Sequence, residues 1–139
     1  MVIRINKIRY GLMVLIAGLL LTACGYTGSG KLELPAAVEG LPVVLHTGYT
    51  FQYNESTEQA DWVAYELTRD ELNGDAKRTN NFKADPLVSS GTATDEDYYK
   101  SGYDRGHLAP AADMTWSEQA MDESFYYSNM SPQHPSFNR

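Results

Sequence analysis

The sequence predicts an α+β fold, because several stretches typical of β-strands are followed by one typical of a short helix. β-Branched and aromatic residues, which favour strands, dominate residues 41–46 and 48–54. Residues 60–68 alternate between two sets of side chains with a period of two, as a strand with two unlike faces does. Residues 115–124 carry the helix signal, so the chain of 139 residues is expected to hold one domain of mixed structure.

Residues 1–23 have the features of a targeting segment rather than of a folded element. Three basic residues, Arg4, Lys7 and Arg9, precede an uncharged apolar stretch at 11–23. This stretch is shorter than the ~20 apolar residues that span a bilayer, and it fits the apolar core of a signal peptide.

A lipidation site is predicted where this segment ends. Leu-Thr-Ala-Cys at residues 21–24 is similar to the bacterial lipobox, in which the cysteine is lipidated. The alternative is an ordinary signal peptide in which Cys24, the only cysteine of the chain, is incidental. The pattern predicts a protein of the bacterial cell envelope, lipid-anchored through Cys24 and facing the periplasm or the exterior. Gly, Ser, Thr and Pro then predict a flexible tether at 24–40, before the domain at 41–139.

Two irregular stretches are expected between the strands and the helix. Asn-Gly-Asp at residues 73–75 is a turn signal that ends the third strand. Residues 77–95 have no strong period and contain Asp-Pro and Ser-Ser-Gly, which predicts a long surface loop. Long loops in compact domains are often functional.

The later elements are expected to be short. Thr115 and Glu118 have the spacing of a capping box at the start of the helix. The aromatic stretch 125–131 predicts a strand. Ser136 could cap one more helix, whose first turn would hold Asn138, but no helix body follows it in the sequence.

The charge balance argues against a broad basic surface. The formal net charge is −7 at pH 7, and beyond the first 23 positions 8 basic residues stand against 18 acidic ones. A protein that grips nucleic acid over a wide face carries the opposite sign. Any contact with phosphate groups should therefore be local or mediated by a metal ion.

The stretch Asp-Arg-Gly-His that ends at His107 is the main candidate for chemistry. A histidine exchanges protons near neutral pH, and the neighbouring Arg105 can bind phosphate through its fork of donors. Gly106 lets the backbone approach another group closely. A lone histidine is more often structural, and that interpretation is preferred for His46 and His134.

Two asparagines downstream, Asn129 and Asn138, offer neutral oxygen ligands. A hard cation such as Mg²⁺ takes oxygen ligands, keeps several waters and often needs one or two protein groups plus substrate phosphate. A histidine base and an asparagine ligand are therefore chemically sufficient. A four-ligand zinc site is not expected, because Cys24 belongs to the predicted anchor.

Three stretches, taken in order, resemble the DNA/RNA non-specific endonuclease family. They are Asp-Arg-Gly-His followed by Ala-Pro (104–110), Ser-Asn-x-x-Pro-Gln (128–133) and Phe-Asn-Arg (137–139), with a further similar stretch at 53–68. The family includes secreted bacterial sugar-non-specific nucleases and mitochondrial endonuclease G. The resemblance runs from about residue 46 to residue 139 and implies a mixed, antiparallel α+β sheet structure with a ββα-metal site, or His-Me finger.

The resemblance also implies the catalytic residues. The family's general base falls on His107, and Arg105 matches the arginine of the signature, which helps to order the site. The magnesium-binding asparagine falls on Asn138, with Mg²⁺ as the expected ion and Mn²⁺ as the alternative.

Three further roles are implied by position. Asn129 falls on a site that supports the centre by holding its loop or ordering water, and Asp104 is a supporting residue of the same motif. Arg78 is the candidate for a phosphate contact, although it lies slightly earlier than the family pattern, whose aromatic-x-x-Asp-Pro element falls at 82–86.

The function implied is one-metal hydrolysis of phosphodiester bonds in DNA and RNA. His107 would take a proton from the attacking water, while the ion on Asn138 would polarise a phosphate oxygen. The partners would be DNA and RNA, held through the phosphate backbone without reading the bases, and the membrane, held through Cys24. The oligomeric state is left open.

One departure from the family pattern leaves other functions open. In the family, Phe-Asn-Arg is followed by a helix with the pattern Gly-x-Trp-x-x-Leu-Glu and by further elements, so the C-terminal part of the domain is expected to be missing here. The acidic composition adds weight to two alternatives. One is a non-catalytic envelope lipoprotein that keeps the nuclease scaffold as a binding module, and the other is a phosphodiesterase acting on a small nucleotide.

Overall fold

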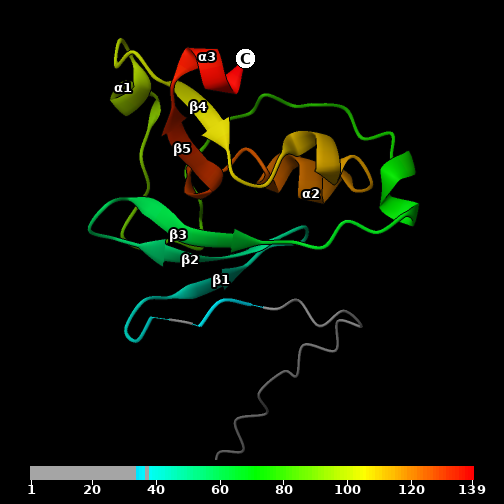
Figure 1. Cartoon of the computed structure of the whole chain (residues 1–139), viewed down its shortest axis with the longest axis horizontal. Helices are drawn as coiled ribbons and strands as arrows, with labels where there is room; N and C mark the ends of the chain where they lie inside the picture. Colours follow the sequence, from blue (N-terminus) through cyan, green and yellow to red (C-terminus); the bar gives the residue numbers. More distant parts are fainter. Residues whose placement is uncertain (1–33, 37) are drawn as a thin grey trace, which may run out of the picture.

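Two small antiparallel sheets with short helices around them make up the structure, a computed structural model that describes residues 34–36 and 38–139 (Figure 1). This mixture confirms the α+β class and the antiparallel sheets that the sequence predicts. The first sheet has the strand order β1 (Val43–Leu45), β2 (Thr50–Asn54), β3 (Gln59–Ala64), and the second pairs β4 (Asp104–His107) with β5 (Met130–Gln133). The helices are η1 (Asp70–Asn73), α1 (Asp95–Tyr98), η2 (Ala111–Met114), α2 (Glu118–Glu123), η3 (Tyr127–Asn129) and α3 (Pro135–Asn138).

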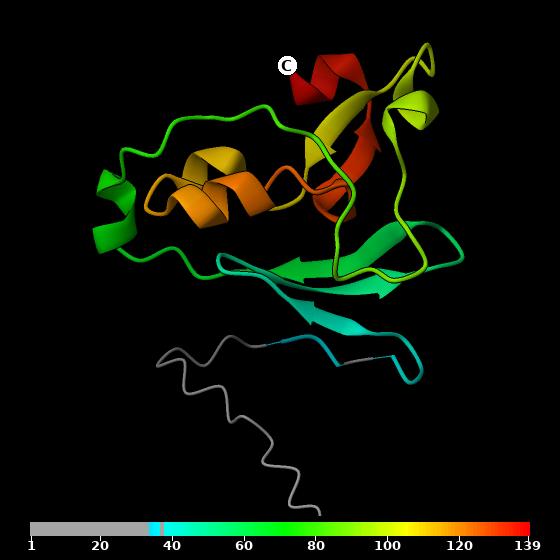
Figure 2. The same ribbon diagram turned by 180° about the vertical axis from the view of Figure 1, so that it is seen from behind.

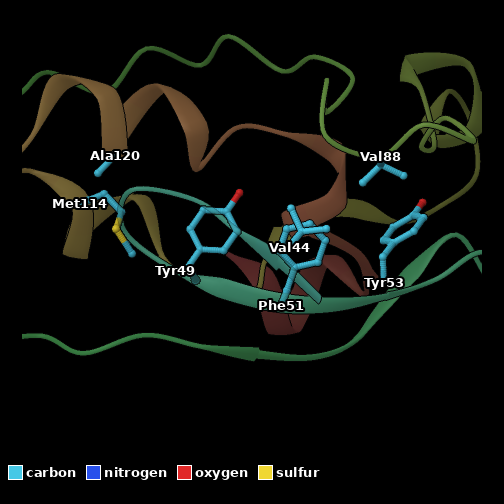
Figure 3. Close-up of a cluster of buried hydrophobic side chains, with 8 residues drawn as sticks. Val44, Tyr49, Phe51, Tyr53, Val88, Met114 and Ala120 are labelled. Carbon is cyan, nitrogen blue, oxygen red and sulfur yellow. The ribbon is translucent and has the colours of Figure 1, made fainter. Parts of the chain in front are cut away.

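The central strand β2 is buried along nearly its whole length because both faces of the first sheet are covered. One face carries the fully buried rings of Phe51 and Tyr53, and each such ring contributes about 2–3 kcal/mol by leaving water. Figure 3 shows Phe51 beside Val44 of β1 and Tyr53 beside Val88 of the segment before α1. Met114 of η2 and Ala120 of α2 lie at the other end of the same cluster, next to Tyr49.

The other face is covered by the residues just before β1. The buried amide of Gln52 donates from Nε2 to the carbonyls of Val38 (3.0 Å) and Leu41 (3.1 Å), and its Oε1 accepts from the Val38 N–H at 2.9 Å. The end of the segment predicted as a flexible tether, 24–40, is thus fixed to the sheet. The predicted signal segment and Cys24 lie outside the described residues. Within the part of the chain that the structure describes, no helix has the length and apolar character needed to cross a membrane.

Two predicted strands have different bounds. The strand predicted at 60–68 ends at Ala64, beyond which the chain leaves the sheet and Tyr65 donates its hydroxyl to Asp113 at 2.8 Å. The strand predicted at 125–131 is wrong in its first half, where the 3-10 helix η3 precedes β5. The aromatic residues there are buried by contacts with distant segments, which strand propensity does not register.

The helix predicted at 115–124 is confirmed as α2, but its cap is not Thr115. Thr115 follows the 3-10 helix η2, and the helix begins at Glu118 with Ser117 as its N-cap. The Ser117 hydroxyl accepts a hydrogen bond from the N–H of Ala120 at 3.3 Å, which satisfies one donor of the first turn.

The segment predicted as a surface loop, 77–95, is also an internal connection. Its Asp85 and Val88 are buried, and Lys83 forms a parallel bridge with Tyr126. Figure 2 shows this segment crossing the helices, descending to the first sheet and then rising to α1. The segment 77–95 therefore contacts both parts of the structure instead of lying only on the surface.

The short helix α3 holds Asn138 in its single turn, as the sequence predicts for a helix at this position. The Asn138 N–H donates to the His134 carbonyl at 3.0 Å. The cap is the His134 ring, whose Nδ1 accepts from the Ser136 N–H at 3.3 Å, so the predicted cap at Ser136 is wrong. Proline at the first helical position favours the helix because its φ is already fixed there.

Candidate active site

The strand β4 presents two site residues on one face. Side chains alternate along a strand, so Arg105 and His107 point the same way, and both lie against the Phe82 ring. The guanidinium carbon of Arg105 is 3.9 Å from the centroid of that ring, and the His107 ring centroid is 6.0 Å from it. Strand β4 can lie close to β5 because of Gly106, where a Cβ atom would come within 2.0 Å of the Gln133 side chain.

The imidazole of His107 is half-buried among aromatic rings and is incompletely hydrogen-bonded. It stands edge-on to Phe125 with ring centroids 4.9 Å apart. Its Nε2 is buried without a hydrogen-bond partner among the described residues. Burial, and to a lesser degree the charge of Arg78, lowers the pKa of His107 to about 4. The ring is therefore neutral at pH 7 and can accept a proton.

Two arginines lie near this ring, and they differ in whether a carboxylate pairs with them. Arg105 donates to Oδ1 of Asp95 at 2.5 Å, which fixes its guanidinium against the Phe82 ring. Arg78 lies over the Phe125 ring at 4.9 Å and donates to Asn80 at 2.8 Å. Among residues 34–36 and 38–139, no carboxylate forms an ion pair with Arg78, so its charge remains available to an anionic ligand.

Asn138 is held near these groups by Asp104, the first residue of β4. Its Nδ2 donates to Oδ2 of Asp104 at 3.3 Å, and Arg139 donates to both oxygens of the same carboxylate at 2.8 Å. The hydrogen bonds from Arg139 hold the pKa of Asp104 below its usual range. No hydrogen bond from the described residues reaches Oδ1 of Asn138, so this oxygen is available as a ligand.

A hollow of about 310 Å³ brings four of the predicted site residues together. Its walls include the proposed base, both arginines and the proposed metal ligand, with the turn after β4 closing one side. The lining residues are Arg78, Arg105, His107, Pro110, Ala111, Ala112 and Asn138. In the part of the chain that the structure describes, there is no cluster of three or more His, Cys, Asp or Glu side chains that could hold a metal ion.

Asn129 lies outside the hollow and is fully buried. Its Nδ2 donates to the carbonyls of Ala109 and Ser124 at 2.9 Å each, and its Oδ1 accepts from the Ala109 N–H at 2.8 Å. Its own carbonyl accepts from the Leu108 N–H at 2.9 Å. These bonds hold the turn that follows His107 against the end of α2, which is compatible with the predicted supporting role.

Sequence reasoning missed three contributors to this site, namely the rings of Phe82 and Phe125 and the carboxylate of Asp95. Phe82 is the aromatic residue of the element at 82–86, but its contact with His107, like that of Phe125, arises only through tertiary packing. Asp95 could have been found, because Thr94 and Asp97 have the capping-box spacing that places it in the first turn of a helix.

Comparison with known proteins gives one family. The family model described as DNA/RNA non-specific endonuclease matches residues 35–139. Mitochondrial endonuclease G of Bos taurus is 42% identical over 118 residues, covering 81% of this chain and 39% of the bovine protein. A nuclease of Nostoc sp. is 42% identical over 93 residues, covering 66% of this chain and 34% of that protein. The chain therefore spans a third to two fifths of these relatives' length.

A solved structure is similar as well. It is the crystal structure of the EndoG/EndoGI complex, described as showing the mechanism of EndoG inhibition. One of its chains matches with a TM-score of 0.65 and 35% identity, covering 70% of this chain and 42% of that one.

The predicted location in a bacterial cell envelope is contradicted by these relatives. The bovine protein and a Homo sapiens relative, 44% identical over 93 residues, are named mitochondrial endonuclease G, and a Saccharomyces cerevisiae relative is named mitochondrial nuclease. A basic, apolar N-terminus is common to several kinds of targeting segment, so the pattern alone did not determine the compartment.

Proposed function

The chain belongs to the DNA/RNA non-specific endonuclease family, and on this premise we propose that it hydrolyses phosphodiester bonds of DNA and RNA with the help of a divalent metal ion. The observation that carries the proposal is the neutral imidazole of His107, which shares one hollow with Arg78 and Asn138. A base, an unpaired cation and an exposed amide oxygen are the groups that this chemistry requires.

His107 acts as the general base. The unprotonated imidazole takes a proton from a water molecule as the water oxygen bonds in line to the scissile phosphorus. The bond from phosphorus to the departing 3′ oxygen breaks, and that oxygen takes up a proton from solvent. Such help contributes typically 10²–10⁴-fold to the rate. The rings of Phe82 and Phe125 hold the imidazole in place, and their low polarity keeps it unprotonated before the water arrives.

The two arginines act on the phosphate in different ways. The guanidinium of Arg78 has no carboxylate partner in the described chain, which suits it to bind the phosphate directly through two parallel hydrogen bonds. Arg105 is fixed by Asp95 and Phe82, which suits it to orient the phosphate rather than to capture it.

The residues present fit a divalent cation that prefers oxygen. Oδ1 of Asn138 has no partner within the described chain, and Asp104 orients the amide by accepting from its Nδ2, as outer groups commonly orient metal ligands. Mg²⁺ is the expected ion and Mn²⁺ the alternative, because a hard cation can bind through one or two protein groups together with substrate phosphate. When bound, the ion would supply Lewis-acid polarisation of a phosphate oxygen.

The test is cleavage of plasmid DNA, of RNA and of a small phosphodiester such as bis(p-nitrophenyl) phosphate. We expect both polymers to be cut with Mg²⁺ and neither to be cut with EDTA. Cleavage of the small ester alone would favour a small-nucleotide phosphodiesterase. No cleavage of any substrate with either Mg²⁺ or Mn²⁺ would contradict the proposal.

A further inference from the structure

A second hollow, of about 500 Å³, adjoins the one that contains His107. The two share Arg78, Arg105 and Asn138, so a ligand in the second lies next to a phosphate held in the first. The remaining wall includes three tyrosines that the proposed hydrolysis does not use, namely Tyr98, Tyr99 and Tyr103, together with Asn80, Phe82, Asp95 and Asp104. The volume falls within the range of about 300–1,000 Å³ that is usual for ligand sites.

Two of these tyrosines lie largely in solvent, and the Lys100 ammonium lies over the Tyr99 ring, 5.0 Å from its centroid. Tyr99 is 72% exposed and Tyr103 is 52% exposed, although aromatic rings of this size usually gain by burial. They stand at either end of a turn in which Lys100 (φ 57°) and Gly102 (φ 86°) adopt left-handed conformations. Lys100 pays a steric cost there that glycine does not, so the turn that displays the two rings is specifically shaped.

The third ring, Tyr98, is held in place by another aromatic ring. It stacks on Tyr127 with centroids 5.9 Å apart and an angle of 28° between the planes. One face is therefore already occupied, and the hollow borders the rest of the side chain. The result is a wall of aromatic surface supported by the protein on one side.

The charges around this wall do not repel a nucleotide. The two carboxylates that line the hollow are each paired with an arginine, Asp95 with Arg105 and Asp104 with Arg139. Arg78 keeps its charge at the border with the His107 hollow. A phosphate is thus attracted at the border, and a flat, weakly polar group is accommodated beside it.

We propose that the second hollow binds the base of an unpaired nucleotide adjacent to the cleaved phosphate, stacked on Tyr99 or Tyr103. The inference rests on the proposed function and adds a subsite to it, one that holds an unpaired nucleotide beside the cleaved phosphate; a duplex would still be cut through the His107 hollow alone. A base within a duplex has both faces covered by its neighbours, so only an unpaired base can lie on a tyrosine ring. Stacking on aromatic side chains tolerates any base, in keeping with a family that is non-specific for sequence.

The experiment measures binding by fluorescence anisotropy in EDTA, with a labelled single-stranded oligonucleotide and the duplex of the same sequence. Tyr99→Ala and Tyr103→Ala are compared with Tyr99→Phe and Tyr103→Phe, which keep the ring. We expect single strands to bind more tightly than the duplex. At least one alanine variant should weaken single-strand binding about tenfold, and its phenylalanine counterpart should restore it. Leu72→Ala, at a 64% exposed position on η1 outside the hollow, should bind like the wild type.

Three results would overturn the inference: equal binding of duplex and single strand, alanine variants that bind like the wild type, or no binding by the wild type. A second arm places one abasic nucleotide at each position in turn, and at one position it should cancel the effect of the alanine variant. His107→Ala tests the proposed function separately, because it should abolish cleavage while leaving this binding intact. Tyrosine-dependent binding without any cleavage by the wild type would remove the nuclease and retain the stacking site.

Discussion

His46 and His107 both sit among aromatic rings, yet the two imidazoles differ in their hydrogen bonding. The His46 side chain is 3% exposed, and its Nε2 lies 2.8 Å from Oδ2 of Asp85. That carboxylate also accepts from the Ser128 hydroxyl at 2.5 Å and from the Leu87 N–H at 2.9 Å. His107 has rings around it but no partner for Nε2 in the described chain.

Under the proposed function, this difference in hydrogen bonding separates a structural histidine, His46, from the general base, His107. A buried polar group left without a partner costs about 1–3 kcal/mol, and Nε2 of His107 is such a group among the described residues, as are the hydroxyls of Tyr53 and Tyr98. The His46 group connects the end of the first sheet with the segment 77–95 and with η3, through the hydrogen bonds that Asp85 accepts. Ser128 of that group precedes Asn129, which holds the turn after His107. The hydrogen-bonded group around His46 and Asp85 thus helps to hold the turn next to His107.

The largest expected effect is on the cleavage rate, when His107 is replaced. His107→Ala should lower the rate of plasmid cleavage by about 10²–10⁴-fold, because the general base is lost. The far-ultraviolet circular dichroism should stay unchanged. The matched control is His46→Gln, which should lower stability but leave the rate per folded molecule within about twofold. If the two variants lost activity equally at the same folded fraction, the assignment of the base to His107 would be wrong.

Changes in the His46 group should lower the free energy of unfolding rather than the cleavage rate. Asp85→Ala removes the acceptor from His46 and Ser128 and should lower the free energy of unfolding by about 3 kcal/mol, as expected for breaking a buried pair. Urea unfolding measures it. Asp61→Ala, which removes an exposed acceptor of Asn54, should change the free energy by less than about 0.5 kcal/mol. A loss below about 1 kcal/mol at Asp85 would mean that the His46 group is not what joins the two regions.

The two histidines also show what the sequence could predict. The local signals were sufficient for the strands near Val44 and Phe51 and for α2. Motif order led to His107 and Asn138, and the structure places both in one hollow; their roles stay predictions. The partner of His46 lies 39 positions away, and no local pattern encodes such a contact.

Local signals also failed where packing between distant segments decides the structure. Phe125 and Tyr127 lie in a stretch that reads as a strand, but both pack on Phe82, and the chain there forms a 3-10 turn. Thr115 and Ser117 are both acceptable caps, and only the position of η2 decides between them. The role of Asp85 was missed because the loop around it has no period.

A smaller effect is expected on the Mg²⁺ dependence of cleavage, when the groups around Asn138 are changed. Asp104→Asn removes the charge that orients the amide of Asn138, and such outer groups typically change metal affinity about 10–100-fold. The concentration of Mg²⁺ that gives half-maximal cleavage should rise by that factor. Asn138→Ala should raise it further and lower the maximal rate as well. If neither substitution moved the Mg²⁺ titration, the metal ligand would have to lie elsewhere in the protein.

The smallest effect is a pH dependence that belongs to His107. Its pKa is lowered to about 4 in the folded protein from the ordinary 6.5. As pH falls from about 6.5 to about 4, His107 becomes protonated in the unfolded chain but stays unprotonated in the folded protein. The free energy of unfolding therefore decreases across this pH range and levels off below it. Because the ring is partly exposed, we expect about 1 kcal/mol rather than the full value of the shift. Urea unfolding at several pH values should show this decline in the wild type and not in His107→Gln. The difference between the two curves cancels the contributions of all other groups, which both proteins share. Parallel curves would mean that the His107 ring is protonated as readily in the folded protein as in water.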